Sequence, residues 1–380
     1  MRGYRRLKWG NDLGHHPVLL KAAVCIVLFF AAVSTFFVLY QDAQYKRYDK
    51  PKVIPLIIAW TPFFSSTLKA PLLSSLYGCP FQCHFISRKE QKLYQREASA
   101  YVLHGRDINL TDLPKRDSKR LNVLMLLESP FHSGSAIHQV PPDFFNATIT
   151  YRRDARYFSP YGRFVPLTGK PDKNSTISIE EVQASLKKKT RGALIFVSNC
   201  ATPSKREQLI KQLGQYTELT VRGGCEARLS FGNKTRKFMC KADCSDDGLI
   251  ATHRFYISFE NSLCNDYITE KFFLRISQKL VPIVVKRQLY EAVHIPSDSF
   301  IALDDFKTVK ELGDYMNYLR SNDTAYLKYF EWTKHYRNPA KYVGNSLCKL
   351  CEDIHMGEKM VIKDIVKYYK EGQCFSAPVT

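Results

Sequence analysis

The residues with the clearest chemical potential lie between Arg254 and Val285. A helix is expected to begin near Asp266, which puts Tyr267, Glu270 and Lys271 on about one turn, with Tyr267 and Lys271 on one face. A carboxylate can accept hydrogen bonds from both ribose hydroxyls, and a lysine can offset diphosphate charge. The group therefore suits a nucleotide, although a solvated, capped helix start would contain the same residue types.

A second feature suited to phosphate lies upstream. Thr202-Pro203 offers a helix N-cap followed by proline at the first helical position, after an apolar strand at Ala193 to Ser198. Backbone N–H groups at such a helix start bind anions, and Arg206 lies in its first turns. The loop lacks both GxGxxG and GxxxxGK[ST], so the alternative that Arg206 only covers a helix face stays open.

Other reactive side chains follow two apolar runs in the first half of the chain. Ser99 to Leu103 is followed by His104-Gly-Arg-Asp107, and Val123 to Leu127 is followed by Glu128-Ser-Pro130. Open α/β sheets form their clefts at the carboxyl ends of strands. These side chains are therefore expected at the edge of a sheet.

The elements that must position these residues alternate in an α/β rhythm. Residues 51–185 contain strand-like runs, and the basic stretch Lys187 to Arg191 is typical of a linker. Beyond it, strand and helix signals alternate, with strands expected at Phe255–Phe259 and Val281–Val285. The pattern predicts two α/β units.

Composition narrows the function classes. The 380 residues, of which 45% are hydrophobic, suffice for two domains with buried cores. The 56 lysines and arginines against 36 acidic residues give a net charge of +20, which favours an anionic partner. No zinc-finger, RNP or helix-turn-helix pattern occurs, so we expect no nucleic-acid partner.

Residues 22–40 form an uncharged apolar stretch whose clearly polar members are Ser34 and Thr35. Cationic residues before it outnumber the single acid Asp12, which keeps the N-terminus cytosolic and places the rest in a lumen. A cleaved signal peptide is the alternative, but the stretch exceeds the usual h-region and no small-x-small site closes it. We therefore expect a single-pass, type II signal anchor.

Glycosylation acceptors fit a lumenal location, because they serve only chains that enter the secretory pathway. The Asn-x-Ser/Thr sequons stand at Asn109, Asn146, Asn174, Asn233 and Asn322. An oxidising compartment also directs the 11 cysteines towards disulfides. Cys79, Cys83, Cys348 and Cys351 have spacings that would also suit zinc, but disulfides are favoured in a lumen.

The segment FYISFENSLCNDYITEKFF, with the later VPIVV and IPSDSFIALDDF, resembles the donor-binding signature of the α-1,3-fucosyltransferases. These are the inverting, GDP-fucose-dependent enzymes of glycosyltransferase family 10. HGRDI, LLESP with a nearby His132, and YRRD followed by PYG resemble acceptor-domain segments of that family in the same order, and CKLC resembles its cysteine pair. The resemblance covers residues from about 79 to 351.

The resemblance implies a GT-B fold, with two Rossmann-like domains facing a central cleft. Together with the anchor it implies six segments: a cytoplasmic tail at 1–21, a transmembrane helix at 22–40, a stem at 41–50, an acceptor-binding domain at 51–185, a GDP-fucose-binding domain at 186–345, and a tail at 346–380 that returns to the acceptor domain.

It also implies roles for individual residues. Glu128 matches the catalytic base, which removes a proton from the acceptor hydroxyl as that hydroxyl attacks the anomeric carbon. Arg106 and His132 match acceptor-side positions. The donor-binding positions are Asn199, Arg206, Tyr256, Asn261, Tyr267, Glu270 and Lys271.

No D-x-D triplet occurs, and the resemblance implies that no metal or other cofactor is required, with room for non-essential stimulation by Mn²⁺. It further implies that Cys79 pairs with Cys348 and Cys83 with Cys351. A second cluster, whose pairing the sequence leaves open, consists of Cys225, Cys240, Cys244 and Cys264. Cys200 and Cys374 have no assigned partner, and Cys25 falls in the anchor.

The implied partners are GDP-fucose, GlcNAc-containing glycan acceptors and the Golgi membrane, with the catalytic region in the lumen. Arg106 occupies the position where Arg accompanies transfer to O3 of GlcNAc in Galβ1-4GlcNAc. Core fucosylation of the innermost N-glycan GlcNAc stays open as an alternative. An inactive lumenal binding protein of the same fold is the second alternative.

Overall fold

The computed structural model describes residues 25–37, 39, 53–169, 175–229 and 245–376. The chain forms two compact units, residues 1–53 and residues 54–380.

In the first unit, residues 25–37 and 39 are helical and exposed. No helix in the described part of the chain is both long and apolar enough to cross a bilayer. The expected span from Ala22 to Tyr40 includes residues 22–24, 38 and 40, which lie outside that part.

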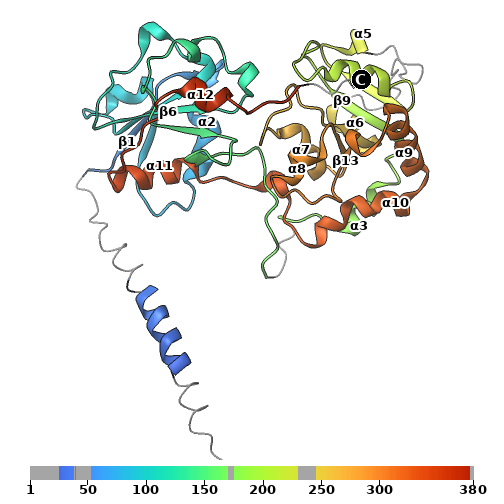
Figure 1. The fold of residues 1–380 in the computed structure, drawn as a ribbon, viewed down its shortest axis with the longest axis horizontal. Helices are drawn as coiled ribbons and strands as arrows, with labels where there is room; N and C mark the ends of the chain where they lie inside the picture. Colours follow the sequence, from blue (N-terminus) through green and yellow to red (C-terminus); the bar gives the residue numbers. More distant parts are fainter. Residues whose placement is uncertain (1–24, 38, 40–52, 170–174, 230–244, 377–380) are drawn as a thin grey trace, which may run out of the picture. The chain divides into compact units, whose positions relative to one another are not determined.

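The second unit contains two main sheets whose strands are all parallel (Figure 1). The first is six-stranded, in the order β4-β1-β5-β6-β7-β8. Its strands are β1 (Leu56–Ala59), β4 (His84–Ser87), β5 (Ala100–His104), β6 (Leu121–Leu126), β7 (Ala147–Thr150) and β8 (Tyr157–Phe158). A short antiparallel hairpin of β2 (Pro62–Phe63) and β3 (Ser66–Thr67) follows β1.

The second sheet is five-stranded, in the order β10-β9-β11-β12-β13. Its strands are β9 (Arg191–Phe196), β10 (Leu219–Arg222), β11 (His253–Ile257), β12 (Val281–Val284) and β13 (Ile301–Ala302). β6 and β11 are buried along their whole length, as expected for parallel strands that are covered on both faces.

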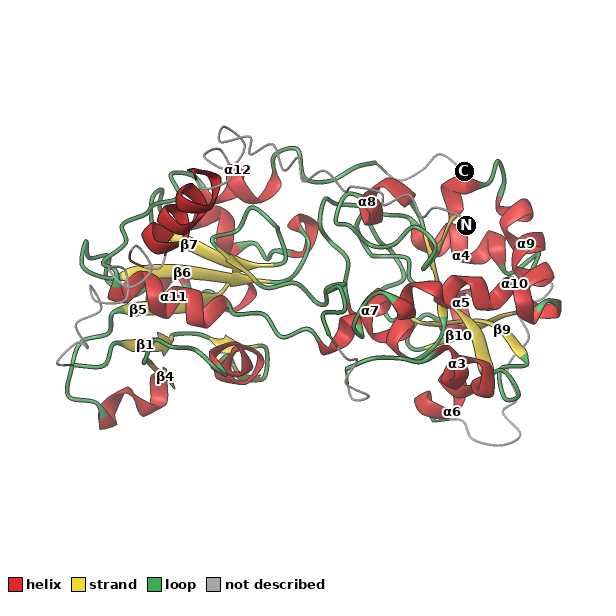
Figure 2. Ribbon diagram, turned by 90° about the horizontal axis from the view of Figure 1, so that it is seen from below, coloured by secondary structure: helices red, strands yellow, loops and turns green. Residues whose placement is uncertain are grey.

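Helices connect the strands and cover the sheets (Figure 2). The described α-helices of this unit are α2 (Lys69–Leu72), α3 (Ile179–Ser185), α4 (Arg206–Leu213), α5 (Glu226–Leu229), α6 (Asp246–Thr252), α7 (Glu270–Ser277), α8 (Arg287–Glu291), α9 (Val309–Ser321), α10 (Asp323–Leu327), α11 (Ser346–His355) and α12 (Ile365–Lys370).

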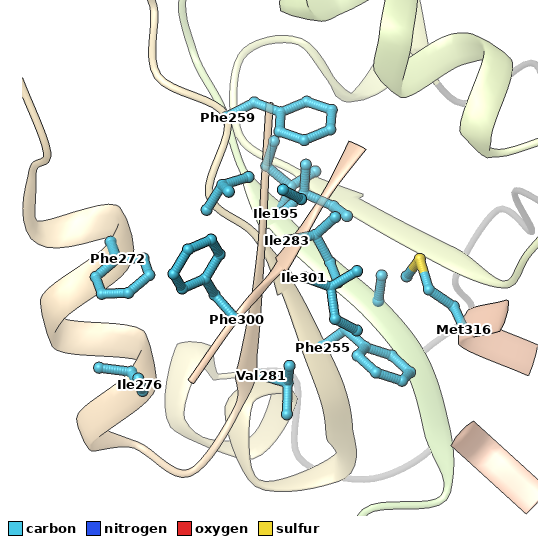
Figure 3. Packing of buried hydrophobic residues seen from close by; sticks show 14 of the residues in the cluster. Ile195, Phe255, Phe259, Phe272, Ile276, Val281, Ile283, Phe300, Ile301 and Met316 are labelled. Carbon is cyan, nitrogen blue, oxygen red and sulfur yellow. The ribbon is translucent and has the colours of Figure 1, made fainter. Parts of the chain in front are cut away.

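The core of the second sheet is formed by large apolar side chains on both faces. Phe272 and Ile276 of α7 lie on one side of the strands and Met316 of α9 lies on the other (Figure 3). The ring centroids of Phe272 and Phe300 are 6.1 Å apart. This packing fixes the strand ends from which the site loops extend.

α4 begins later than the sequence predicts. Its first residue is Arg206, because Lys205 has a left-handed backbone with φ of 50° that prevents an earlier start at Pro203. The Thr202 hydroxyl donates to Glu207 at 2.9 Å instead of capping the helix. The predicted cap at Thr202 is therefore wrong.

α7 also begins late, at Glu270. Asp266 has a left-handed backbone with φ of 60°, and Thr269 is the N-cap, accepting from the Lys271 N–H. Tyr267 lies in the preceding loop, so the predicted placement of Tyr267 and Lys271 on one helical face is wrong.

The C-terminal helices α11 and α12 lie beside the strands of the first sheet, as Figures 1 and 2 show. Disulfides join Cys79 to Cys348 and Cys83 to Cys351, so α11 is covalently attached to the segment that precedes β4. In this structure the four cysteines are oxidised and offer no thiolate to a metal ion.

The structure gives the pairing of two members of the second cysteine cluster. Cys225 is bonded to Cys200 and Cys264 to Cys374, so each pairs with a cysteine to which the sequence assigned no partner. Cys200 and Cys225 meet because they follow the adjacent parallel strands β9 and β10. The remaining members, Cys240 and Cys244, lie outside the described residues.

Among the expected glycosylation sites, Asn109 is exposed and Asn322 is partly exposed. Asn146 is also partly exposed; its side-chain N–H₂ donates to the Met360 carbonyl at 2.8 Å and its Oδ1 accepts from the Asn122 N–H at 2.7 Å. Glycosylation at these three positions stays a prediction. Asn174 and Asn233 lie outside the described residues.

Lys189, just before β9, is buried at 2% exposure. Its ammonium donates to the carbonyls of Ile250 at 3.1 Å and His253 at 2.9 Å. Burial lowers the pKa of Lys189 to about 7, and the nearby cations Lys279 and Arg254 add to the shift. Protonation of Lys189 is therefore unfavourable in the folded state.

This burial predicts a pH-dependent stability. Above pH 7 the unfolded chain, with its ordinary lysine pKa of 10.5, binds more protons than the folded chain, so stability rises with pH. Between about pH 7.5 and 9, the free energy of unfolding of the wild type should gain about 1–2 kcal/mol over that of Lys189→Met. Denaturant titration at both pH values measures this gain. The control is Lys188→Met, at the exposed neighbour, whose free energy of unfolding should change with pH as that of the wild type does. If Lys189→Met and the wild type changed equally with pH, the lowered pKa of Lys189 would be contradicted.

Candidate functional site

The loops that carry the predicted GDP-fucose-binding residues meet at the carboxylate of Glu260. Glu260 follows β11 and is 4% exposed. This carboxylate accepts from the N–H and the hydroxyl of Thr269, both at 2.8 Å. The ammonium of Lys271 lies 3.3 Å from its other oxygen. Three donors thus hold the start of α7 against the end of β11.

Burial and neighbouring charges shift the pKa values of both partners of this pair. Burial raises the pKa of Glu260, and Glu270 adds to the rise, while Lys271 and the hydrogen bonds from Thr269 oppose it. Burial lowers the pKa of Lys271, but the carboxylates of Glu260 and Glu270 outweigh that effect and raise it. Lys271 therefore carries its positive charge at neutral pH, at the N-terminal end of α7.

Arg206 brings a second cation to the same place. It is 4% exposed, and its guanidinium donates to the carbonyls of Phe259 at 2.9 Å and Asn199 at 3.4 Å. Within the described residues no carboxylate forms an ion pair with it. Burial lowers the pKa of Arg206, and the carboxylate of Glu260 opposes this shift most strongly. An arginine held by neutral carbonyls keeps its charge available for an anion.

The loops that carry Arg206 and Lys271 are tied together through Ser204. Its hydroxyl donates to the Glu260 carbonyl at 2.7 Å, and its N–H donates to the Asn261 carbonyl at 3.1 Å. Nε of Arg206 and Oδ1 of Asn261 are buried without a hydrogen-bond partner in the described chain. Such atoms cost free energy, so pairing them with a ligand would favour binding.

Glu128 approaches this region from the first sheet, two residues beyond the end of β6. Its Oε2 accepts from the Tyr267 hydroxyl at 3.3 Å. Tyr267 is 4% exposed, and burial raises its pKa well above the ordinary value, so its hydroxyl stays protonated and can donate. This contact joins a carboxylate of the first sheet to the loop that opens α7.

His132 forms a second connection between the sheets. Its Nδ1 lies 3.1 Å from the Ser129 hydroxyl, and its Nε2 lies 3.4 Å from the side-chain N of Asn199. Burial lowers the pKa of His132; Glu128 opposes the shift, while Arg106 and Arg206 add to it. His132 is therefore close to the base candidate and to cations of both sheets.

Arg106 lies at the exposed side of the same edge, in the 3₁₀ turn η3 (Gly105–Asp107) after β5. Its guanidinium carbon is 5.3 Å from the centre of the Phe64 ring. The Phe64 N–H donates to Asp107 at 2.7 Å, so the β2–β3 hairpin is held against this turn. Arg106 therefore has an open face for a polar ligand.

The structure brings most of the predicted site residues together through this network of contacts. They are Glu128, His132, Asn199, Arg206, Asn261, Tyr267 and Lys271. Glu270 is exposed at the rim, where its carboxylate accepts from the Lys271 ammonium at 3.2 Å.

Tyr256 does not share this arrangement. It is 1% exposed and packs among Leu194, Leu249 and Leu280. Its hydroxyl accepts a hydrogen bond from the Phe196 N–H at 3.2 Å. The expectation of donor contact at Tyr256 is therefore corrected to a role in packing beneath the site.

Sequence reasoning missed Glu260 and Ser262. The Ser262 hydroxyl lies 2.8 Å from the Ser129 hydroxyl and makes a further link between the two sheets. A signal for Glu260 was present, because it follows an apolar strand run in the same way as Glu128 does. Nothing in the sequence signals the pairing of Ser262 with Ser129.

Comparison with known proteins shows the family of the chain. Residues 52–162 match the family described as fucosyltransferase, N-terminal, and residues 186–368 match glycosyltransferase family 10 (fucosyltransferase) C-term. Alpha-(1,3)-fucosyltransferase fut-1 of Caenorhabditis elegans is 36% identical over 286 residues, which cover 74% of this chain and 59% of that protein. Alpha-(1,3)-fucosyltransferase C of Drosophila melanogaster is 31% identical over 338 residues, covering 82% of this chain and 75% of that protein.

A crystal structure of alpha1,3-fucosyltransferase with GDP superimposes with a TM-score of 0.50 at 16% identity, covering 82% of this chain and 93% of that chain. At that identity the likeness shows the fold alone, and it confirms the expected α/β architecture with two parallel sheets. On the sequence matches, the chain belongs to glycosyltransferase family 10, the fucosyltransferases.

Proposed function

We propose that this chain is a GDP-fucose-dependent α-1,3-fucosyltransferase, which transfers L-fucose with inversion to O3 of GlcNAc in glycoprotein or glycolipid glycans. Family membership supports the donor and the reaction class. The observation that carries the mechanism is the 3.3 Å contact between the Tyr267 hydroxyl and Glu128. It puts a carboxylate of the first sheet beside the cationic loops of the second.

Glu128 acts as the general base in this mechanism. As the acceptor hydroxyl attacks the anomeric carbon from the face opposite GDP, its proton passes to the carboxylate and the bond from that carbon to the GDP oxygen breaks. Inversion in one displacement requires no covalent intermediate. Tyr267 fixes Oε2, which leaves Oε1 to accept the proton.

Arg206 and Lys271 supply positive charge for the diphosphate. Both are held in place before the donor binds, so they stabilise the charge that develops on GDP as it leaves without having to reorganise. Glu270, at the exposed rim, is placed to accept from the ribose hydroxyls. Asn199 and Asn261 add polar contacts beside the phosphates.

This mechanism requires no cofactor, because the two cations take the role that a metal ion plays in other glycosyltransferases. Added Mn²⁺ is then expected to change rates without being essential.

The acceptor choice rests on Arg106. Its exposed guanidinium beside the Phe64 ring offers a donor and an apolar face together, an arrangement that suits a sugar ring. We favour the lactosamine GlcNAc as acceptor and keep the innermost GlcNAc of N-glycans as the alternative.

We also propose that residues 22–40 anchor the chain in the Golgi membrane, with the catalytic region in the lumen. The helical residues 25–37 are exposed and apolar, and the hydroxyls of Ser34 and Thr35 donate to the Ala31 carbonyl at 2.9 and 2.6 Å. These internal hydrogen bonds pair the two hydroxyls within the helix, as an apolar environment requires. Recovery of the full chain in the soluble fraction after carbonate extraction would contradict the anchor.

The first experiment offers GDP-fucose with two acceptors to the purified protein: N-acetyllactosamine and an N-glycan glycopeptide with terminal GlcNAc. Product mass and linkage analysis should show α-1,3-fucose on the lactosamine, with and without EDTA. Fucose on the innermost GlcNAc would establish the core alternative, and loss of transfer in EDTA would contradict metal independence. Donor binding without transfer to either acceptor would indicate an inactive binding protein.

The general base is tested by Glu128→Gln, which keeps the size of the side chain but cannot take the proton. We expect kcat to fall by about 10²-fold or more, since general-base catalysis is worth that much, while GDP affinity stays near the wild-type value. Glu97→Gln, an exposed carboxylate paired with Arg120, serves as the control and should keep full activity. A kcat of Glu128→Gln within about tenfold of the wild type would show that another group is the base.

The phosphate role of Lys271 is tested in a set of variants, because Lys271→Met alone leaves Glu260 buried and unpaired. The double variant Glu260→Gln with Lys271→Met removes both charges and should recover stability. It should still bind GDP about tenfold or more weakly by calorimetry, since a hydrogen bond to a charged group is worth about 1.5–3 kcal/mol. Glu260→Gln alone keeps the ammonium, so it should bind GDP more tightly than the double variant does. Unchanged affinity in the double variant would remove Lys271 from the donor site.

A further inference from the structure

The last described residues of the chain connect the segment of Glu128, the proposed base, to the loop between β11 and α7, called here the donor loop. α12 packs on the first sheet through Ile365 and Tyr369, which share a buried cluster with Leu124 and Leu126 of β6. Residues 369–375, called here the C-terminal strap, continue the chain from the end of α12. Cys374 of this strap is disulfide-bonded to Cys264. Cys264 lies in the loop between β11 and α7.

Tyrosine hydroxyls hold the backbone that carries Glu128. Tyr369 is 1% exposed, and its hydroxyl lies 2.6 Å from the Glu128 carbonyl and 3.2 Å from the Leu126 carbonyl. The intervening carbonyl of Leu127 accepts from the Tyr161 hydroxyl at 2.7 Å. The two hydroxyls thus lie within hydrogen-bond distance of three successive carbonyls at the end of β6, and the shorter contact of Tyr369 is the one to Glu128. These contacts limit the movement of the segment.

The other end of the strap is fixed to the donor loop by more than the disulfide. The Asn265 N–H donates to the Gln373 carbonyl at 2.8 Å, and the Phe375 N–H donates to the Leu263 carbonyl at 2.7 Å. These bonds form a short antiparallel pairing around Cys264 and Cys374. The donor loop thus cannot move away from the strap without breaking a covalent bond.

The contacts form a closed ring. It runs from the Glu128 carbonyl to Tyr369, along the strap to Cys374, across the disulfide to Cys264, on to Tyr267, and back to the Glu128 carboxylate. One side of the ring belongs to the first sheet and the other to the donor-side loop. Its closure fixes the distance between the two.

We propose that Tyr369 and the Cys264–Cys374 bridge are positioning elements for the transfer reaction, because together they hold Glu128 at a set distance from the donor loop. The proposal rests on the function proposed above. Transfer needs the reacting groups in a near-attack arrangement, and a misplacement of about 1 Å costs up to about 10²-fold in rate. Tyr369 acts through the Glu128 backbone and needs no contact with substrate.

The test compares two neighbouring tyrosines of α12 in the full chain. Tyr369→Phe keeps the ring but removes the hydroxyl that donates to Glu128. We expect its kcat to fall between about 10- and 100-fold, while the GDP Kd and acceptor KM stay within about twofold of the wild type. Tyr368→Phe is the matched control, because its hydroxyl lies 3.4 Å from Thr148 and from Asp154, away from Glu128, so its kcat should be unchanged.

A second variant tests the covalent side of the ring. Cys264→Ser with Cys374→Ser should also lower kcat more than it weakens GDP binding. Adding Tyr369→Phe to it should cost less than the product of the separate losses, because both changes open one ring. The pair Cys79→Ser with Cys348→Ser removes a disulfide outside the ring and controls for a general loss of stability.

The outcomes separate two kinds of failure. A lowered melting temperature of Tyr369→Phe with kcat unchanged would show that the contact is structural and overturn the positioning role. Losses that multiply independently would show that Tyr369 and the disulfide do not act as one ring. A wild-type protein that binds GDP but transfers no fucose would instead overturn the proposed function on which this inference rests.

Discussion

The buried ion pair between Glu260 and Lys271 is the interaction on which the donor side of the site depends. The Glu260 carboxylate is almost inaccessible to water. It pairs with the Lys271 ammonium and accepts two hydrogen bonds from Thr269. Removing one partner of such a pair costs about 3–5 kcal/mol, because the remaining charge is buried without compensation. The pair therefore holds the start of α7 against the end of β11. The Lys271 ammonium and the N-terminus of α7 lie together there.

The loop after β9 depends on the same carboxylate segment. Ser204 donates to the Glu260 carbonyl, and Arg206 donates to the carbonyl of the preceding Phe259. β9 and β11 are adjacent parallel strands, so their carboxyl ends lie side by side and their loops can share these contacts. Two cations on different loops are thereby fixed in one place before any anion arrives, which is the arrangement that favours stabilisation of a leaving diphosphate.

The sequence predicted most strands, because parallel strands buried on both faces appear as continuous apolar runs, as in β6 and β12. It did not predict the starts of α4 and α7, since these follow from tertiary contacts. Asp266 takes a left-handed backbone while its carboxylate accepts from the N–H and Nε of Arg153, more than a hundred residues earlier. Tyr256 has a local pattern that indicates ligand contact, but it is buried and its hydroxyl accepts from the Phe196 N–H.

The same distinction applies to Glu128, which the sequence could suggest as a base although it could not show where the side chain lies. Glu128 follows an apolar run, which any reader of the sequence can see, but a carboxylate at the end of one sheet is a base only if it reaches a donor held by the other. That separation is set by Tyr267 on the carboxylate and by Tyr369 and Tyr161 on the backbone. Burial raises the pKa of all three phenols well above the ordinary value, so their hydroxyls remain protonated donors at neutral pH. Neutral hydroxyl donors therefore hold the Glu128 segment in place without adding a net charge to the site.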